Sequence, residues 1–515
     1  MVCTVDRCRS GHGSGSEKRS VMKASKSIFL LLTALLAAGL LSCGGASEPV
    51  SEKAPDAENE GASPAETEAV TEVDHTYDDA LPELDFGGAA FIINSKSQDE
   101  ASWVNTVMDT KTMNGDLIND AIFNRNRKLE ERFNFVFDNP ACEGDRTTYA
   151  RKAIMAGSDE FDVFMMTDRD ALSLSAEGVL IPYDEMEYMD FSRPYWSQSL
   201  NQALTIGGVR YFAYGDFNLS PYDYTHMLVF NKQLAAAYDL GSLYDLVLSG
   251  KWTYDAYEKL TKAVTHDVDG DGQMGENDCY GLLSQTKQVL PGFWIGAGVL
   301  SIEKNEADIP AFLLAEDEVF ANVIDRIFSM TYDNDTYFRN SANRNDDTLC
   351  QTMFMDERGL FYDTTFKLIT NLREMDADFG IMPYPKWNEE QESYRSRVEG
   401  GDFAIVPVTN TKLEMTGALL EAMSSESAKQ LIPVYYEIAL KTKTSRDAES
   451  EEMLEIIYRN RVYDLGDTYW CTLLRDGMFL TMFDKNDREL ASKIAKNQSK
   501  VDKAISKIVD AFVNG

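Results

Sequence analysis

The sequence predicts an α/β fold with a largely parallel sheet, because short apolar strands alternate with amphipathic helices along the folded part of the chain. The first strand is expected over residues 89–93, and the helix after it carries apolar residues at helical intervals over 118–133. A second helix over 148–157 leads into a second strand over 160–166. The 515 residues, 44% of them hydrophobic, are enough for a large core or two packed domains.

The elements further along the chain continue this alternation, and no repeat of fixed period interrupts it. Residues 167–186 are expected to form a helix and a turn. Apolar runs predict strands at 208–216, 224–232, 378–385 and 401–408. Apolar residues at helical spacing predict helices at 242–264, 318–330, 415–424, 451–460 and 489–513.

The beginning of the chain carries an export signal. Lys23 and Lys26 precede an apolar run of about 14 residues, which ends in Leu-Leu-Ser-Cys at Cys43. This run is shorter than the roughly 20 residues that span a bilayer, which argues against a transmembrane helix. The ending resembles the lipobox of bacterial lipoproteins, in which the cysteine is acylated and becomes the mature N-terminus. Residues 1–42 are therefore expected to be a leader and signal peptide with Met22 as the true start, and the protein is expected at the outer face of the cell membrane.

The segment 43–83 is rich in Glu, Ala, Ser and Pro and is expected to be a solvated, disordered tether. Cleavage before Cys43 removes six basic and two acidic residues and changes the net charge from −36 to about −40. Such a surface repels nucleic-acid phosphates, which excludes nucleic-acid binding. It also repels anionic lipid, so the acyl chain must hold the protein at the membrane.

The stretch "DVDGDGQMGEND" at 267–278 fits two incompatible patterns. Gly270, Gly272 and Gly275 spell the G-x-G-x-x-G of a dinucleotide-binding turn. Carboxylates among these glycines would repel a pyrophosphate, however, and the preceding "LTKAVTHD" has the spacing of a helix end and not of a buried strand. The dinucleotide interpretation is therefore excluded.

The same stretch matches the D-x-D-x-D-G pattern of a calcium loop. Gly272 would allow the sharp turn, and Gly275 would act through a water. Asp278 stands at the twelfth position, where the EF-hand has a glutamate, so its shorter reach predicts a modest affinity. The alternative, an acidic surface turn without metal, stays open. The predicted protein ligands of calcium are Asp267, Asp269, Asp271, Gln273 and Asp278.

Four cysteines remain in the mature chain, namely Cys142, Cys279, Cys350 and Cys471. Their wide spacing excludes a C-x-x-C metal or redox motif. Export permits disulfides, but a chain of this length does not need them, so disulfides and buried free thiols are both open.

Several segments, taken in order, carry a family resemblance that covers the chain from about residue 84 to its end. They include "EFDVFMMTDRD", "GGVRYFAYG", "DGDGQMGENDCYGL", "DFGIMPYPKW" and "GGDFAIVPV". This order resembles the family 1 extracellular solute-binding proteins, the maltose-binding type that serves carbohydrate ABC importers. The resemblance implies a periplasmic-binding-protein-like fold of two α/β lobes with hinge crossings and an interlobe cleft. The implied N-lobe is 84–226 with 398–445, and the implied C-lobe is 227–397 with 446–515.

The resemblance also implies a carbohydrate ligand, membrane subunits of an importer as partners, and a chain that acts as a monomer. Sugar binding needs aromatic platforms for C–H faces and charged or amide groups for hydroxyls. Asp168 and Arg169 follow a strand end, where ligands of open α/β sheets collect, and look like the Asp-Arg pair of the family. Trp294, Trp470 and Asp402 are the further candidates, each weighed against core packing or a surface turn.

Two other function classes stay open as alternatives. A secreted carbohydrate-active enzyme would need a pair of carboxylates, but such pairs arise by chance in so acidic a chain. The H-E-x-x-H, G-x-S-x-G and Walker A patterns are absent, so we expect no enzymatic activity. A surface lipoprotein that binds glycans without transport would keep the anchor and tether but would not need a hinged cleft.

Overall fold

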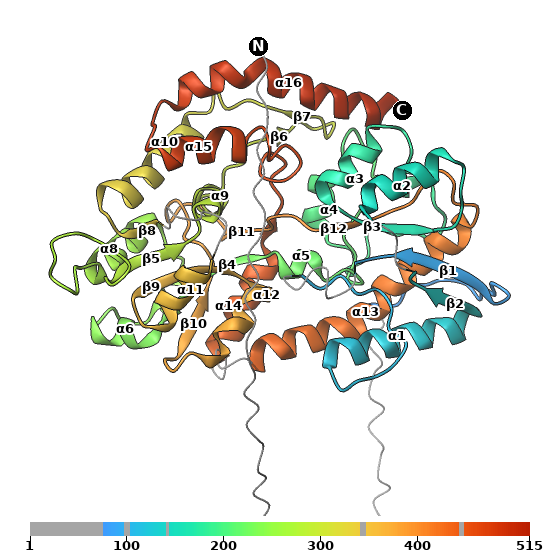
Figure 1. Cartoon of the computed structure of the whole chain (residues 1–515), viewed down its shortest axis with the longest axis horizontal. Coiled ribbons are helices and arrows are strands. Elements are labelled where there is room, and N and C mark those ends of the chain that lie inside the picture. Colours follow the sequence, from blue (N-terminus) through green and yellow to red (C-terminus); the bar gives the residue numbers. More distant parts are fainter. Residues whose placement is uncertain (1–75, 97–103, 141–143, 340–346, 442–447, 515) are drawn as a thin grey trace, which may run out of the picture. The chain divides into compact units, whose positions relative to one another are not determined.

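The computed structural model describes residues 76–96, 104–140, 144–339, 347–441 and 448–514. The described residues belong to one compact unit that contains two main β-sheets (Figure 1). The expected leader, the lipidation site Cys43 and most of the expected tether lie outside the described residues.

The first sheet has the strand order β12-β3-β1-β2. Its strands are β1 (Ala89–Asn94), β2 (Phe135–Asp138), β3 (Val163–Thr167) and β12 (Asp402–Ile405). β1 runs parallel to β2 and β3, whereas β12 is antiparallel to β3. Helices α1 (Leu117–Phe133) and α13 (Leu413–Lys441) lie together on one face, and α2 (Arg146–Met155) and α3 (Asp168–Ser175) cover the other (Figure 1).

The second sheet has the strand order β10-β4-β9-β5-β8. Its strands are β4 (His226–Asn231), β5 (Tyr280–Ser284), β8 (Tyr337–Arg339), β9 (Gly359–Thr365) and β10 (Phe379–Met382). β5 is parallel to β8 and β9, and β4 is antiparallel to β9 and β10. Every residue of β4, β5 and β9 is buried, as expected for central strands covered on both faces.

The helices against the second sheet are α8 (Tyr254–Val264), α11 (Thr348–Met355) and α14 (Ala448–Arg459). The other helices are α4 (Gln198–Leu204), α5 (Ser220–Asp223), α6 (Lys232–Ala237), α7 (Leu243–Leu248), α9 (Thr286–Gly296), α10 (Glu318–Phe328), α12 (Phe366–Ile369), α15 (Leu480–Asp484) and α16 (Leu490–Asn514). The short strands are β6 (Glu303–Lys304), β7 (Pro310–Ala311), β11 (Ser396–Arg397) and β13 (Arg461–Val462). Short 3-10 and π turns are η1 (Tyr183–Glu185), η2 (Ser329–Asp333), η3 (Thr370–Glu374) and η4 (Arg475–Phe479).

Segments that connect the two sheets meet beside one another. Thr225, directly before β4, forms a bridge with Val398, which follows β11 and precedes β12 in the chain. β11 in turn pairs in parallel with β13. The backbone at the start of β4, the approach to β12 and the segment after α14 are therefore hydrogen-bonded to one another.

Most of the expected elements are confirmed, and the exceptions have local causes. Residues 208–216 are not a strand: the N–H and C=O of Tyr214 bond to the Asn201 side chain, which takes the place of a ladder partner. The expected helix 242–264 divides into α7 and α8, because Gly250 between them adopts a φ of +73° that ends a helix.

The state of the cysteines is answered for the part of the chain that the structure describes. Cys279, Cys350 and Cys471 are buried free thiols, and Cys142 lies outside that part. Within the same residues, no helix has both the length and the apolar character needed to cross a bilayer.

Candidate ligand-binding site

A polar cavity of about 120 Å³ opens at the carboxyl end of β3. In open α/β sheets this is the edge where ligands bind, because strand ends and helix starts leave polar groups directed outward. The residues that line it are Thr167, Asp168, Arg169, Tyr224, Glu399, Gly400, Gly401, Asp402, Asp467, Thr468, Cys471 and Arg475. Three of the predicted site residues, Asp168, Arg169 and Asp402, are therefore brought together.

Asp168 is the first residue of α3 and is 8% exposed. One carboxylate oxygen accepts the Arg169 N–H at 2.9 Å, and the other accepts the Tyr463 hydroxyl at 3.3 Å. Burial raises the pKa of Asp168 to about 7, although these bonds and the Arg169 charge oppose the rise. The carboxyl group is therefore poised to accept or donate a hydrogen bond near neutral pH.

Arg169 is exposed at the rim of the cavity. Among the residues that the structure describes, no carboxylate accepts a hydrogen bond from its guanidinium. The five N–H donors of this side chain are thus available to a ligand.

Asp402 faces Thr167 across the antiparallel β12–β3 pair, which fixes it beside Asp168. Both of its carboxylate oxygens accept from the Lys96 ammonium, at 3.1 and 3.2 Å. Lys96 lines a second cavity of about 240 Å³, which shares Thr167 with the first. It meets the lining of the first cavity through Asp402.

The two glycines before Asp402 permit close packing against protein groups. A Cβ on Gly400 would lie 3.1 Å from a carboxylate oxygen of Asp168, and one on Gly401 would lie 2.3 Å from the Tyr214 hydroxyl. Paired glycines of this kind can also let the backbone approach a ligand. In the structure they let it approach Asp168 and Tyr214.

A buried charge network supplies other residues of the cavity lining. Arg397, fully buried on β11, holds Asp467 with two hydrogen bonds of 2.6 and 3.0 Å. Arg475 donates to the Asp467 carbonyl at 3.0 Å. Glu399 lies within 4.0 Å of both arginines. Burial opposes its ionisation, but Arg397, His226 and Lys287 outweigh burial and hold the pKa of Glu399 well below its usual range.

The two tryptophans do not line this cavity. Trp294 is fully buried, and its indole N–H donates to Asp464 at 2.9 Å while its ring packs on Phe320 and Phe479. Trp470 is 5% exposed, although its neighbours Thr468 and Cys471 reach the cavity. Neither indole therefore offers a platform at this cavity, because its area is already used in the core.

Sequence reasoning missed Glu399, Asp467 and Arg475. Glu399 could have been found, because it directly precedes the glycines that lead to Asp402. Asp467 and Arg475 carry no such signal, since Asp467 is held by Arg397, 70 residues earlier in the chain, and Arg475 in turn contacts Asp467.

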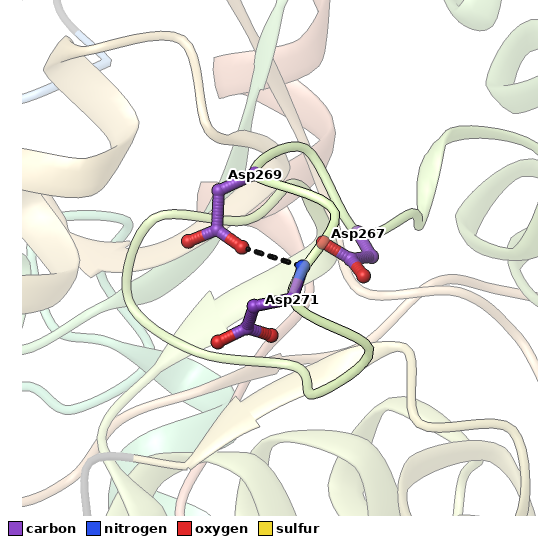
Figure 2. Close-up of side chains that lie close together, drawn as sticks. All are labelled: Asp267, Asp269 and Asp271. Atoms are coloured by element: carbon purple, nitrogen blue, oxygen red, sulfur yellow. Dashed lines mark hydrogen bonds between the residues drawn. The ribbon is translucent and has the colours of Figure 1, made fainter.

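The acidic loop 267–278 brings its three leading carboxylates together (Figure 2). One oxygen from each of Asp267, Asp269 and Asp271 lies within 4.8 Å of the others. The loop N–H groups of Gly270 and Gly272 bond to Asp267, and that of Asp271 bonds to Asp269. This convergence is the geometry that a calcium ion requires of the first half of its loop.

Asp278 closes the loop from its other end. It is 1% exposed, and its two oxygens accept N–H groups from Val268 at 2.8 Å and Gly275 at 2.6 Å. Although desolvation opposes it, these bonds lower the pKa of Asp278, so the group is ionised. An anionic carboxylate at the twelfth position fits the donor set of a hard cation.

No protein-family model matches the sequence, and no curated protein is detectably similar to it. Solved structures do share its fold. UspC of M. tuberculosis is similar with a TM-score of 0.52 and 11% identity, over 82% of this chain and 100% of that one. A cyclo/maltodextrin-binding protein complexed with maltotetraose matches with a TM-score of 0.52 and 12% identity, over 83% and 97%. The ABC substrate-binding protein Lmo0181 from Listeria monocytogenes, in complex with cycloalternan, matches with a TM-score of 0.50 and 13% identity, over 81% and 99%. The chain therefore has the two-lobed fold of maltose-binding type.

Proposed function

We propose that this protein is the lipid-anchored substrate-binding protein of a carbohydrate ABC importer. The observation that carries the proposal is the polar cavity at the end of β3, which gathers Asp168, Arg169 and Asp402 in a fold shared with sugar-binding proteins. Sugar hydroxyls are recognised by charged side chains in partly desolvated clefts, where such hydrogen bonds are strong.

The residues that line the cavity have different roles in binding. Arg169 donates to ligand oxygens, while Asp168 and Glu399 accept from ligand hydroxyls. Asp402 and Asp467 are held by Lys96 and Arg397, so they contribute shape and fixed charge. Closure of the lobes around the sugar would present the closed form to the membrane subunits of the importer.

The test is calorimetric titration of the purified mature protein with maltotriose, maltotetraose, cycloalternan and a panel of other neutral and acidic oligosaccharides. At least one should bind with 1:1 stoichiometry, without release of reducing sugar, and should make the protein more compact in small-angle scattering. Turnover of a bound glycan would instead establish an enzyme. Binding without compaction would favour a glycan-binding surface lipoprotein that takes no part in transport.

We expect Cys43→Ala to release the protein from the membrane fraction, because the acyl chain is the proposed anchor and the acidic body is repelled by anionic lipid. The measurement is immunoblotting of membrane and soluble fractions after an alkaline wash. Ser42→Ala, which keeps the cysteine and a small residue before it, is the control and should stay bound. A Cys43→Ala protein that also stayed with the membrane would contradict the lipoprotein proposal.

We further propose that the loop 267–278 binds calcium for stability. Asp267, Asp269 and Asp271 would supply side-chain oxygens, Gln273 its carbonyl and Asp278 the closing carboxylate. The ion would neutralise part of the repulsion among the converging carboxylates and fix the turn between α8 and β5.

Chelation of calcium is accordingly expected to lower the Tm by roughly 5 °C when the wild type starts at a calcium concentration about a hundredfold above Kd. Differential scanning calorimetry with and without chelator measures the shift. The double variant Asp269→Asn, Asp271→Asn keeps acceptors for the loop N–H groups but loses two charges, so its Tm should not respond. A wild-type Tm that is the same with and without chelator would contradict the calcium proposal.

A further inference from the structure

A buried histidine lies directly behind the cavity wall. His226, the first residue of β4, is 1% exposed. Its Nδ1 is 3.2 Å from an oxygen of Asp363 on β9, and its Nε2 is 3.2 Å from an oxygen of Glu399. Glu399 lines the cavity, whereas the histidine does not. His226 therefore contacts the lining of the cavity at Glu399.

The same Nε2 has a second neighbour, because Nη1 of Arg397 also lies 3.2 Å from it. A ring nitrogen either donates a proton to a carboxylate or accepts one from a guanidinium, and it cannot do both at once. Doubly protonated His226 donates to Asp363 and Glu399. Singly protonated His226 keeps its hydrogen bond to Asp363, accepts a hydrogen bond from Arg397 and no longer donates to Glu399.

The charges around the ring favour the doubly protonated form. Burial and Arg397 lower the pKa of His226, but the carboxylates of Asp363 and Glu399 outweigh them and raise it. Lys287 and Arg475 face Glu399 at 3.8 Å each and do not contact the ring. Asp363 is itself fixed by the Ser284 hydroxyl at 2.9 Å, so one end of the bridge is rigid.

We propose that His226 is the positioning residue for Glu399: with both ring nitrogens protonated, it ties this carboxylate to Asp363 and holds it at the cavity wall. The idea rests on the proposed binding function for its consequence, since a fixed Glu399 presents its remaining lone pairs to a ligand hydroxyl. When the second proton is lost, Nε2 accepts a hydrogen bond from Arg397 and no longer donates to Glu399. Oε2 of Glu399 then keeps the hydrogen bond from Gln288, at 3.3 Å. The wall of the cavity then loosens as pH rises.

The test needs no ligand and is therefore independent of whether a sugar binds. Histidine-selective ¹⁵N and ¹³C NMR of the mature chain follows His75, His226 and His266, and His226→Gln identifies the signal of interest. We expect the His226 imidazole to titrate above the usual value of about 6.5, since the carboxylates of Asp363 and Glu399 raise its pKa. Glu399→Gln should lower that midpoint by about one unit, a tenfold loss of proton affinity. The signal of His266, which contacts Tyr238 and lies outside this network, is the internal control.

A second readout separates positioning from a purely structural role. The backbone amide of Gly400, next to Glu399, should shift with the midpoint of His226 in the wild type and should lose that transition in His226→Gln. If Glu399→Gln does not fold, Asp363→Asn removes the other partner and should lower the midpoint in the same way. A His226 that titrates at or below the usual value of about 6.5, a midpoint unchanged by loss of either carboxylate, or a Gly400 amide that does not follow the histidine would each overturn the proposal.

Discussion

Replacing Arg397 with methionine is expected to lower the free energy of unfolding by about 3–5 kcal/mol, the usual cost of removing one partner from a buried ion pair. Arg397 is fully buried, and the Asp467 carboxylate that it holds is equally inaccessible. Methionine fills most of the volume but supplies no donor, so Asp467 keeps its charge with only the longer 3.4 Å contact from Arg475. Urea unfolding at pH 7 measures the loss.

Two controls show whether the unpaired charge of Asp467 causes the loss of stability. Arg397→Met combined with Asp467→Asn removes the unpaired charge and should recover part of the loss. Arg151→Met breaks an Arg–Glu pair whose side chains are 37% and 36% exposed, and it should cost less than about 1 kcal/mol. If Arg397→Met cost no more than Arg151→Met, the buried network would not be holding Asp467 in place.

Replacing Asp168 with alanine is expected to weaken binding of the tightest oligosaccharide in the panel by about 2–4 kcal/mol, a thirtyfold to nearly thousandfold loss of affinity. Asp168 is almost wholly buried, so its carboxyl group meets the ligand with little competition from water. The substitution also removes the carboxyl group whose ionised form interacts with the Arg169 charge. Calorimetric titration at pH 7 measures the change.

The matched control is Asp255→Ala, which removes a carboxylate that is 92% exposed and paired with Arg326 at 2.9 Å. This variant should bind the same sugar within threefold of the wild type, because a surface ion pair contributes little. Trp470→Ala, tested in parallel, decides whether that indole reaches a ligand. Should Asp168→Ala bind like Asp255→Ala while remaining folded, the cavity at the end of β3 would not be the sugar site.

The acidic half of the candidate site could be predicted because local sequence places it. Asp168 follows a continuous apolar strand, and a residue at that position must lie at the carboxyl edge of the sheet. Asp402 opens a strand after two glycines, so it too belongs to an element boundary. A tryptophan carries no comparable signal: Trp294 was a candidate platform, but its N–H is satisfied inside the core by Asp464.

The sequence by itself determined the α/β class, the order of most strands and helices, and the acidic loop 267–278, because hydrophobic period and ligand spacing are local properties. Only the tertiary structure decided which carboxylates share a wall. Arg397 and Glu399 come from one segment and Asp467 from another, 70 positions later, and His226 reaches Asp363 across 137 positions of sequence. The partner of a buried charge depends on which backbone segments the fold brings close together. Such a charge needs a partner because an unpaired charge in a dry interior costs too much free energy to be tolerated.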